Sequence, residues 1–303
     1  MGRSQRTSRR RSVPPPRRWR APVLLPLSLL GLPLLWILGG SRQATLEAGY
    51  GWLDPEAIEL ELPEDRTDPR WEATLQGVIR EFGPVALDDG ARIAELRRQL
   101  EALSFVAETD DPRVVWPAGV EFPIRLRRPV ACVTLGERFL TVDDEGVLLE
   151  GDFLAPPRLG AGHLPVLAPV ADGRFDRAAP GDSLSLEADL DALSIASAMW
   201  EHLSPAALEL LGRITIDARA APHTSVSRAG AILALEGRRS VAFGRAPRAN
   251  AGGSLPVESK WAGVAYGLQQ LVGPDARDWV ELDVRFDEPT FEWRRGDSGS
   301  DGR

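Results

Sequence analysis

The chain has 303 residues, a formal net charge of −8 at pH 7 and one cysteine, Cys132, so it cannot form an internal disulfide. All the charges in residues 1–40 are eight arginines within residues 1–20, which leaves −16 on residues 41–303. A part this acidic will not bind nucleic acid or an anionic membrane surface through bulk charge, but it is long enough to bury one or two hydrophobic cores.

An apolar stretch, residues 21–40, follows the arginine-rich segment. Residues 21–38 carry no charge, and a helix of that length rises about 27 Å, close to the thickness of a bilayer's hydrocarbon core. The arginines before it place the N-terminus in the cytoplasm by the positive-inside rule. We therefore expect a basic cytoplasmic tail over 1–20 and a single transmembrane anchor over 21–40. A cleaved signal peptide has the same basic and apolar parts and remains the alternative.

A connector over 41–55 precedes a small α+β unit that we expect over 56–128. Its residues alternate between period-two and helical patterns, in the order strand, helix, helix, strand, strand. This order predicts helices packed on one face of a short sheet. The expected elements are Ile58–Leu62, Trp71–Phe82, Asp88–Leu103, Phe105–Val115 and Val120–Arg127.

From residue 129 to 293 short strands and turns dominate, which predicts a mixed β-rich domain with flanking helices. Helical spacing favours two helices, Leu184–Leu203 and Val257–Leu271, whereas the proline-rich and glycine-rich segment Ala155–Pro165 is expected to be loop. The polar tail 294–303 is expected to be disordered. The expected strands are Val130–Leu135, Phe139–Val142, Val147–Leu149, Arg213–Ala218, Ala231–Glu236, Ser240–Gly244, Trp279–Phe286 and Thr290–Trp293.

The sequence offers no constellation typical of an enzyme. His163, His202 and His223 lack the spacings that bring metal ligands together, and Cys132 lies in an apolar strand where a packing role is expected. The acidic run Asp143–Gly146 has the composition of a hairpin turn. We therefore predict a protein without catalytic residues, cofactor, metal or small-molecule substrate.

Several segments resemble motifs of the FtsQ/DivIB family of bacterial cell-division proteins, and they occur in that family's order. Four of them lie in one stretch: Trp116-Pro117, the alternating strand Val120–Leu126, the junction Arg127–Ala131, and the hairpin Val142–Gly146. Others precede or follow it: Leu103–Val106, Leu164–Leu167, Leu235–Gly237 with Val241 and Gly244, and Asp283–Phe286.

The resemblance implies a POTRA domain over 56–128 and a β-domain over 129–293. It also implies a non-enzymatic, single-pass protein of the cytoplasmic membrane with extracytoplasmic (periplasmic) domains. Members of the family bind the small division proteins FtsB and FtsL and help to control septal peptidoglycan synthesis. An FtsB-type partner adds a β-strand near the C-terminus of the β-domain.

In this chain that edge would be Glu288–Trp293, backed by Trp279–Phe286, and the expected partner-binding residues are Arg285, Phe286, Phe291 and Trp293. In an extended strand Phe291 and Trp293 share one face and Glu292 takes the other. These aromatic residues fit an anchor for a partner strand, or they close the domain's own core; both interpretations stay open.

Two other functions remain as alternatives at this point. A membrane-anchored POTRA adaptor for secretion or envelope assembly would use the same folding unit with different partners. An anchored extracytoplasmic enzyme would need a site that the sequence does not show.

Overall fold

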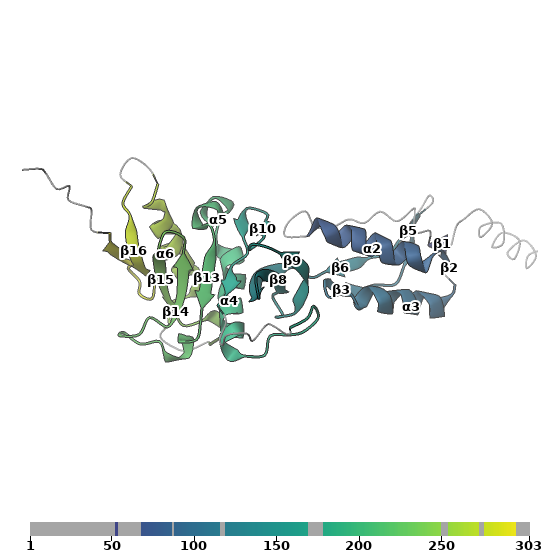
Figure 1. Cartoon of the computed structure of the whole chain (residues 1–303), viewed down its shortest axis with the longest axis horizontal. Coiled ribbons are helices and arrows are strands. Elements are labelled where there is room, and N and C mark those ends of the chain that lie inside the picture. Colours follow the sequence, from purple (N-terminus) through teal and green to yellow (C-terminus); the bar gives the residue numbers. More distant parts are fainter. Residues whose placement is uncertain are drawn as a thin grey trace, which may run out of the picture. The chain divides into compact units, whose positions relative to one another are not determined.

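The computed structural model describes residues 52–53, 68–86, 88–115, 119–168, 178–249, 254–272 and 276–294, whose helices and strands are labelled in Figure 1. The basic tail, the predicted anchor over 21–40 and the predicted strand Ile58–Leu62 lie outside these ranges, as do the Trp116-Pro117 motif and the tail after Arg294. Among the described helices none is both long and apolar enough to cross a membrane.

The described residues form a mixed α+β fold with a large β-sheet and five α-helices, which confirms the predicted class. Two of the helices lie before residue 128 and match the predicted pair. Asp68 caps α2 by accepting a hydrogen bond from the backbone N–H of Arg70 at 3.0 Å, and Asp89 caps α3 through Arg92 at 3.1 Å. The elements of this part are β1 (Trp52–Leu53), α2 (Pro69–Phe82), β2 (Val85–Ala86), α3 (Gly90–Glu101), β3 (Val106–Thr109), β4 (Arg113–Val115), β5 (Gly119–Glu121) and β6 (Ile124–Leu126).

The four strands after α3 form two antiparallel pairs. β3 pairs with β6 and β4 pairs with β5, both antiparallel, so the two predicted strands are present as two short pairs. The pair β3 and β6 shares a hydrophobic cluster with α2 and α3, in which the rings of Trp71 and Phe105 stack 4.9 Å apart. The two-residue strand β1 lies within the predicted connector 41–55, whose bounds stay a prediction.

The rest of the chain is built on a nine-stranded sheet in the order β17-β16-β15-β14-β13-β12-β7-β8-β9. β12 runs parallel to both of its neighbours and β15 runs parallel to β16, whereas the other pairs are antiparallel. The strands are β7 (Pro129–Leu135), β8 (Arg138–Asp143), β9 (Leu148–Phe153), β12 (Val166–Leu167), β13 (Ile214–Asp217), β14 (Ala231–Leu235), β15 (Arg239–Gly244), β16 (Trp279–Asp283) and β17 (Thr290–Trp293).

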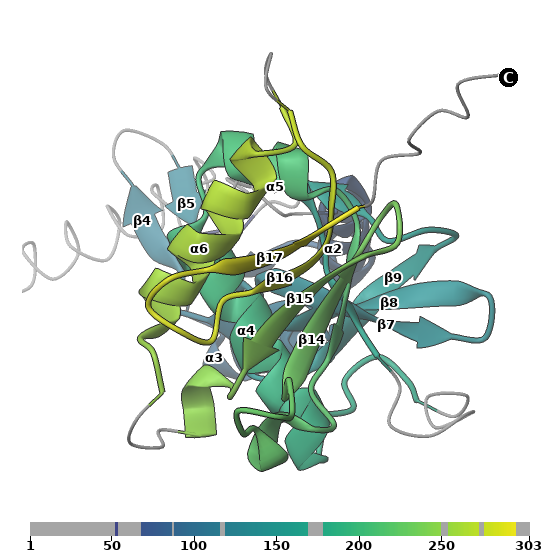
Figure 2. The ribbon, with the colours of Figure 1, turned by 90° about the vertical axis from the view of Figure 1, so that its left-hand side faces the viewer.

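The helices α4 (Glu187–His202), α5 (Pro205–Leu211) and α6 (Val257–Gln269) share a second hydrophobic cluster with this sheet. Alternate residues of β13 and β14 are buried, as expected for strands with one covered face. Figure 2 shows α4 and α6 together with the strands β14 to β17.

Several short elements depart from the predictions. β10 (Arg158–Leu159) and β11 (Gly162–His163) pair as a small hairpin inside the predicted loop 155–165, so that prediction is wrong in part. The helix α5 was not predicted; Ser204 caps it and Pro205 opens it, a helix start that the sequence does contain. The division into independent domains at residues 128 and 129 stays a prediction.

Arg127 joins two of the segments that carry the family resemblance. Its guanidinium donates to Asp143 at 2.6 Å and to Glu145 at 2.7 Å, and Asp143 also accepts from the backbone N–H of Val147 at 2.7 Å. The Asp143 side chain is only 1% exposed. Its burial raises the pKa of this carboxyl, and the hydrogen bond from Arg127 opposes that rise.

Replacing Arg127 by alanine should lower the free energy of unfolding by about 3 kcal/mol, because it leaves a buried carboxylate without its cation. Replacing Arg125, whose ion pair with Glu108 is exposed, should cost about 1 kcal/mol or less. Urea denaturation of both variants measures the difference. Equal losses would contradict a structural role for the buried pair.

Candidate functional site

The described residues hold no group of three or more histidine, cysteine or acidic side chains that could bind a metal ion. Cys132 is fully buried, and its burial raises the pKa of the thiol, so its thiolate is not available as a nucleophile. His163 contacts the carbonyl oxygen of Pro156, while His202 ends α4 and His223 lies in the short 3₁₀ turn Ala221–His223. These residues do not come together as a reactive centre.

A cavity of about 210 Å³ lies beside the start of α6, between Arg245 and Lys260. The Lys260 ammonium donates to the carbonyl of Arg245 at 2.9 Å, and burial lowers its pKa to about 8. No acidic side chain lines the cavity with them. The lining thus holds a lysine bound to a backbone carbonyl and one hydroxyl side chain, Ser254.

The most distinctive surface is the end of the large sheet at β17. In the described structure β17 has a hydrogen-bonded neighbour, β16, on one side only. Figure 2 shows β17 at the margin of the sheet beside β16. An unpaired strand edge carries free backbone donors and acceptors, which are the groups that an added strand would use.

The residues whose backbone faces this open side can be identified. The N–H of Arg294 donates inward, to the carbonyl of Asp278 at 2.9 Å. Because the backbone groups of successive strand residues point to opposite edges, Glu292 also faces β16. The N–H and C=O groups of Phe291 and Trp293 therefore point outward.

The helix α6 holds this end of the sheet in place. A Cβ atom at Gly267 would lie 2.4 Å from a methyl carbon of Leu282, so the helix and β16 approach more closely than a side chain would allow. The Trp279 ring adds a hydrogen bond from its N–H to the carbonyl of Gly267 at 2.9 Å. The open edge is thus built on a rigidly packed neighbour.

The aromatic side chains of β17 lie together. The rings of Phe291 and Trp293 stack with their centroids 4.8 Å apart, and Tyr266 of α6 meets Phe291 edge to face at 5.9 Å. Phe291 is half-buried and packs against the large core, while Trp293 leaves 38% of its surface exposed beneath Arg277. Phe291 therefore contributes to the core, whereas Trp293 is the more exposed of the two rings, and partner binding by either stays a prediction.

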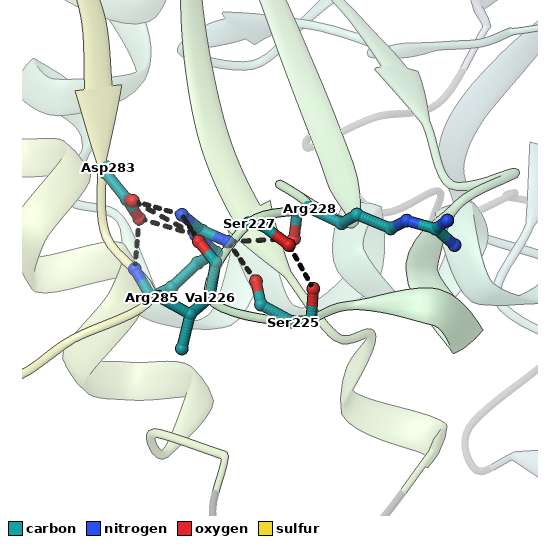
Figure 3. Close-up of polar contacts among 6 residues, drawn as sticks. All are labelled: Ser225, Val226, Ser227, Arg228, Asp283 and Arg285. Atoms are coloured by element: carbon teal, nitrogen blue, oxygen red, sulfur yellow. Dashed lines mark hydrogen bonds and ion pairs between the residues drawn. The ribbon is translucent and has the colours of Figure 1, made fainter.

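Arg285, a predicted partner-binding residue, uses its side chain for hydrogen bonds within the chain. It donates to the carboxylate of Asp283 through two nitrogens, and a third donates to the carbonyl oxygens of Ser225 at 2.7 Å and Arg228 at 2.8 Å. Figure 3 shows the guanidinium between Asp283 and the turn over 225–228. The hydrogen bond to Asp283 is the main cause of its raised pKa. Its geometry fits a residue that positions this turn.

Phe286, the fourth predicted residue, is exposed and lies beneath the Arg285 guanidinium, 5.2 Å from it. The register pairs Trp293 with Trp279 at the start of β16, whereas Arg285 and Phe286 follow the end of that strand. The structure therefore brings Phe291 and Trp293 together and places Arg285 and Phe286 at the other end of β17. Tyr266 of α6 and Arg277, which lies just before β16, were not predicted, because no local pattern relates them to β17.

At the opposite edge of the sheet, side chains bind backbone groups of the edge strand β9. The N–H of Glu150 donates to the hydroxyl of Ser104 at 2.7 Å, and its carbonyl accepts from the Trp71 ring N–H at 3.0 Å. Side chains from the first part of the chain thus satisfy an edge residue of β9. Capping of this kind blocks strand addition, and no described side chain caps β17 in the same way.

No family model matches the chain. It is 30% identical over 142 residues to a protein of Streptomyces coelicolor named cell division protein FtsQ, covering 43% of this chain and 47% of that protein. A protein of Streptomyces bingchenggensis with the same name is 30% identical over 169 residues, which cover 54% of this chain and 55% of that one. The chain spans about half the length of the curated relatives it matches. The two matches therefore show that about half of the chain is similar to cell-division proteins named FtsQ, in agreement with the resemblance that the ordered motifs indicate.

Proposed function

We propose that this chain is a non-enzymatic scaffold of the bacterial division complex that binds a partner by adding its strand to β17. The FtsQ relatives indicate a role in cell division. The observation that supports strand addition is the open edge at β17, where the outward backbone groups of Phe291 and Trp293 adjoin an exposed aromatic ring. Partners of the FtsB and FtsL type follow from the family.

We propose a role for each remaining part of the chain. Residues 21–40 anchor the protein in the cytoplasmic membrane, and the domains after them are extracytoplasmic. The part over 56–128 is a POTRA-like unit, and 129–293 is the β-domain that carries the partner site. Two helices that share a hydrophobic cluster with the antiparallel pair β3 and β6 are consistent with the first of these assignments.

A chain with this role should gather at the division site. A fluorescent fusion to the complete chain, produced in its native host, is expected to form a band at the septum during division. A signal spread evenly around the cell periphery would contradict a division role and favour the alternative of an envelope-assembly adaptor.

Strand addition is tested by comparing Trp293→Ala with Trp293→Pro. Both variants lose the indole ring, but only proline also removes the outward N–H, which an edge strand can lose without breaking its own pairing. We expect proline to weaken binding of an FtsB-type partner about two- to tenfold more than alanine does. This factor corresponds to the net free energy of one backbone hydrogen bond. Isothermal titration calorimetry of the complete chain measures both affinities.

The control for this pair is the melting temperature, which should be similar in the two variants because both lose the ring and the outward N–H donates to no described residue. Equal affinities for the partner would show that the outward N–H is unused and that the partner does not add a strand here. Phe291 is unsuitable for this comparison, since its ring also packs against the core.

A further inference from the structure

Two glutamates face one another at the open edge. Glu281 of β16 and Glu292 of β17 are directly opposite in the register, and both are exposed. The Cβ atoms of two residues that are directly opposite lie about 5 Å apart. Like charges on two such side chains destabilise the pairing of the strands. The chain therefore maintains an unfavourable contact on the face of β17 opposite the aromatic rings.

The nearby cations bind aspartates, and of the two glutamates Glu281 has an electrostatic interaction with Arg285. Arg285 is paired with Asp283, and Arg294 and Arg239 both bind Asp278, at 3.2 and 3.0 Å. Neither glutamate side chain forms a hydrogen bond or ion pair with a described residue. A strand added beyond β17 would place its own side chains next to Glu292, where a cation would be favoured.

A second copy of this chain is a poor occupant of the edge. In the two-fold register that pairs Phe291 with Trp293 of the second copy, Glu292 would lie opposite its own symmetry mate. The edge would then hold four carboxylates in one row across the two sheets. Charge complementarity thus favours a different protein with basic side chains at this position.

We propose that the strand added at β17 comes from a second protein and is amphipathic, with lysine or arginine on the face beside Glu281 and Glu292 and apolar residues on the face beside Phe291 and Trp293. This inference rests on the proposed strand addition and specifies the partner's chemistry. The outward backbone groups supply attachment, the aromatic face accepts alternate apolar residues, and the glutamate pair selects charge.

The test uses a displayed library of random 12-residue peptides, selected on the purified complete chain and on two single variants. On the natural chain we expect peptides that alternate apolar residues with lysine or arginine. Glu292→Lys should shift the alternate positions toward aspartate or glutamate. Glu137→Lys, in the exposed turn between β7 and β8, makes the same change in net charge and should leave the basic preference intact.

A selected peptide then gives a quantitative check. Replacing its basic residue by glutamine should weaken binding to the natural chain about two- to fivefold, and this difference should vanish with Glu292→Gln. Alternating peptides without a charge preference would overturn the inference and leave strand addition standing. Recovery of no alternating peptides would overturn both, and self-association that Trp293→Pro abolishes would identify a second copy as the occupant.

Discussion

A strand at the end of a β-sheet has backbone donors and acceptors with no partner inside the sheet, and the two ends of the nine-stranded sheet meet this constraint in opposite ways. At β9, Ser104 and Trp71 bind both backbone groups of Glu150. At β17, the corresponding groups of Phe291 and Trp293 face outward without a described partner. This difference leaves β17 as the open edge in the described sheet, and the proposed partner site is built on it.

The surroundings of β17 combine rigidity with exposed chemistry. The close contact between Gly267 and Leu282 fixes β16 against α6, and β17 is built on β16. Arg285 holds the turn over 225–228 at the end of the same strand. An edge held in this way needs little rearrangement to accept another strand, so less of the binding free energy is lost to ordering.

Much of the local structure follows from the sequence because its signals are local. Asp68, Pro69 and Gly83 mark the ends of α2, and the alternation in Thr290–Trp293 predicts β17. The two-residue strand β12 could not be predicted, because it exists through parallel pairing with β7 and β13, which are distant along the chain. The order of the strands is likewise a property of the assembled sheet.

At the site, too, the features that depend on contacts between distant residues could not be predicted. The shared face of Phe291 and Trp293 follows from strand geometry, but the difference in their burial depends on α6, which packs beside only one of them closely. Arg285 was expected to contact a partner because of its place in a motif. Its contacts with the turn over 225–228 bring together residues almost 60 positions apart, and no local pattern indicates them.

The openness of β17 can be measured without any partner, by amide hydrogen exchange resolved to single residues in the complete chain. The amides of Phe291 and Trp293 should exchange at rates close to those of an unstructured chain, whereas the inward amides of Glu292 and Arg294 should be protected. Protection of Phe291 and Trp293 equal to that of Glu292 would show that the edge is already occupied and would contradict the account.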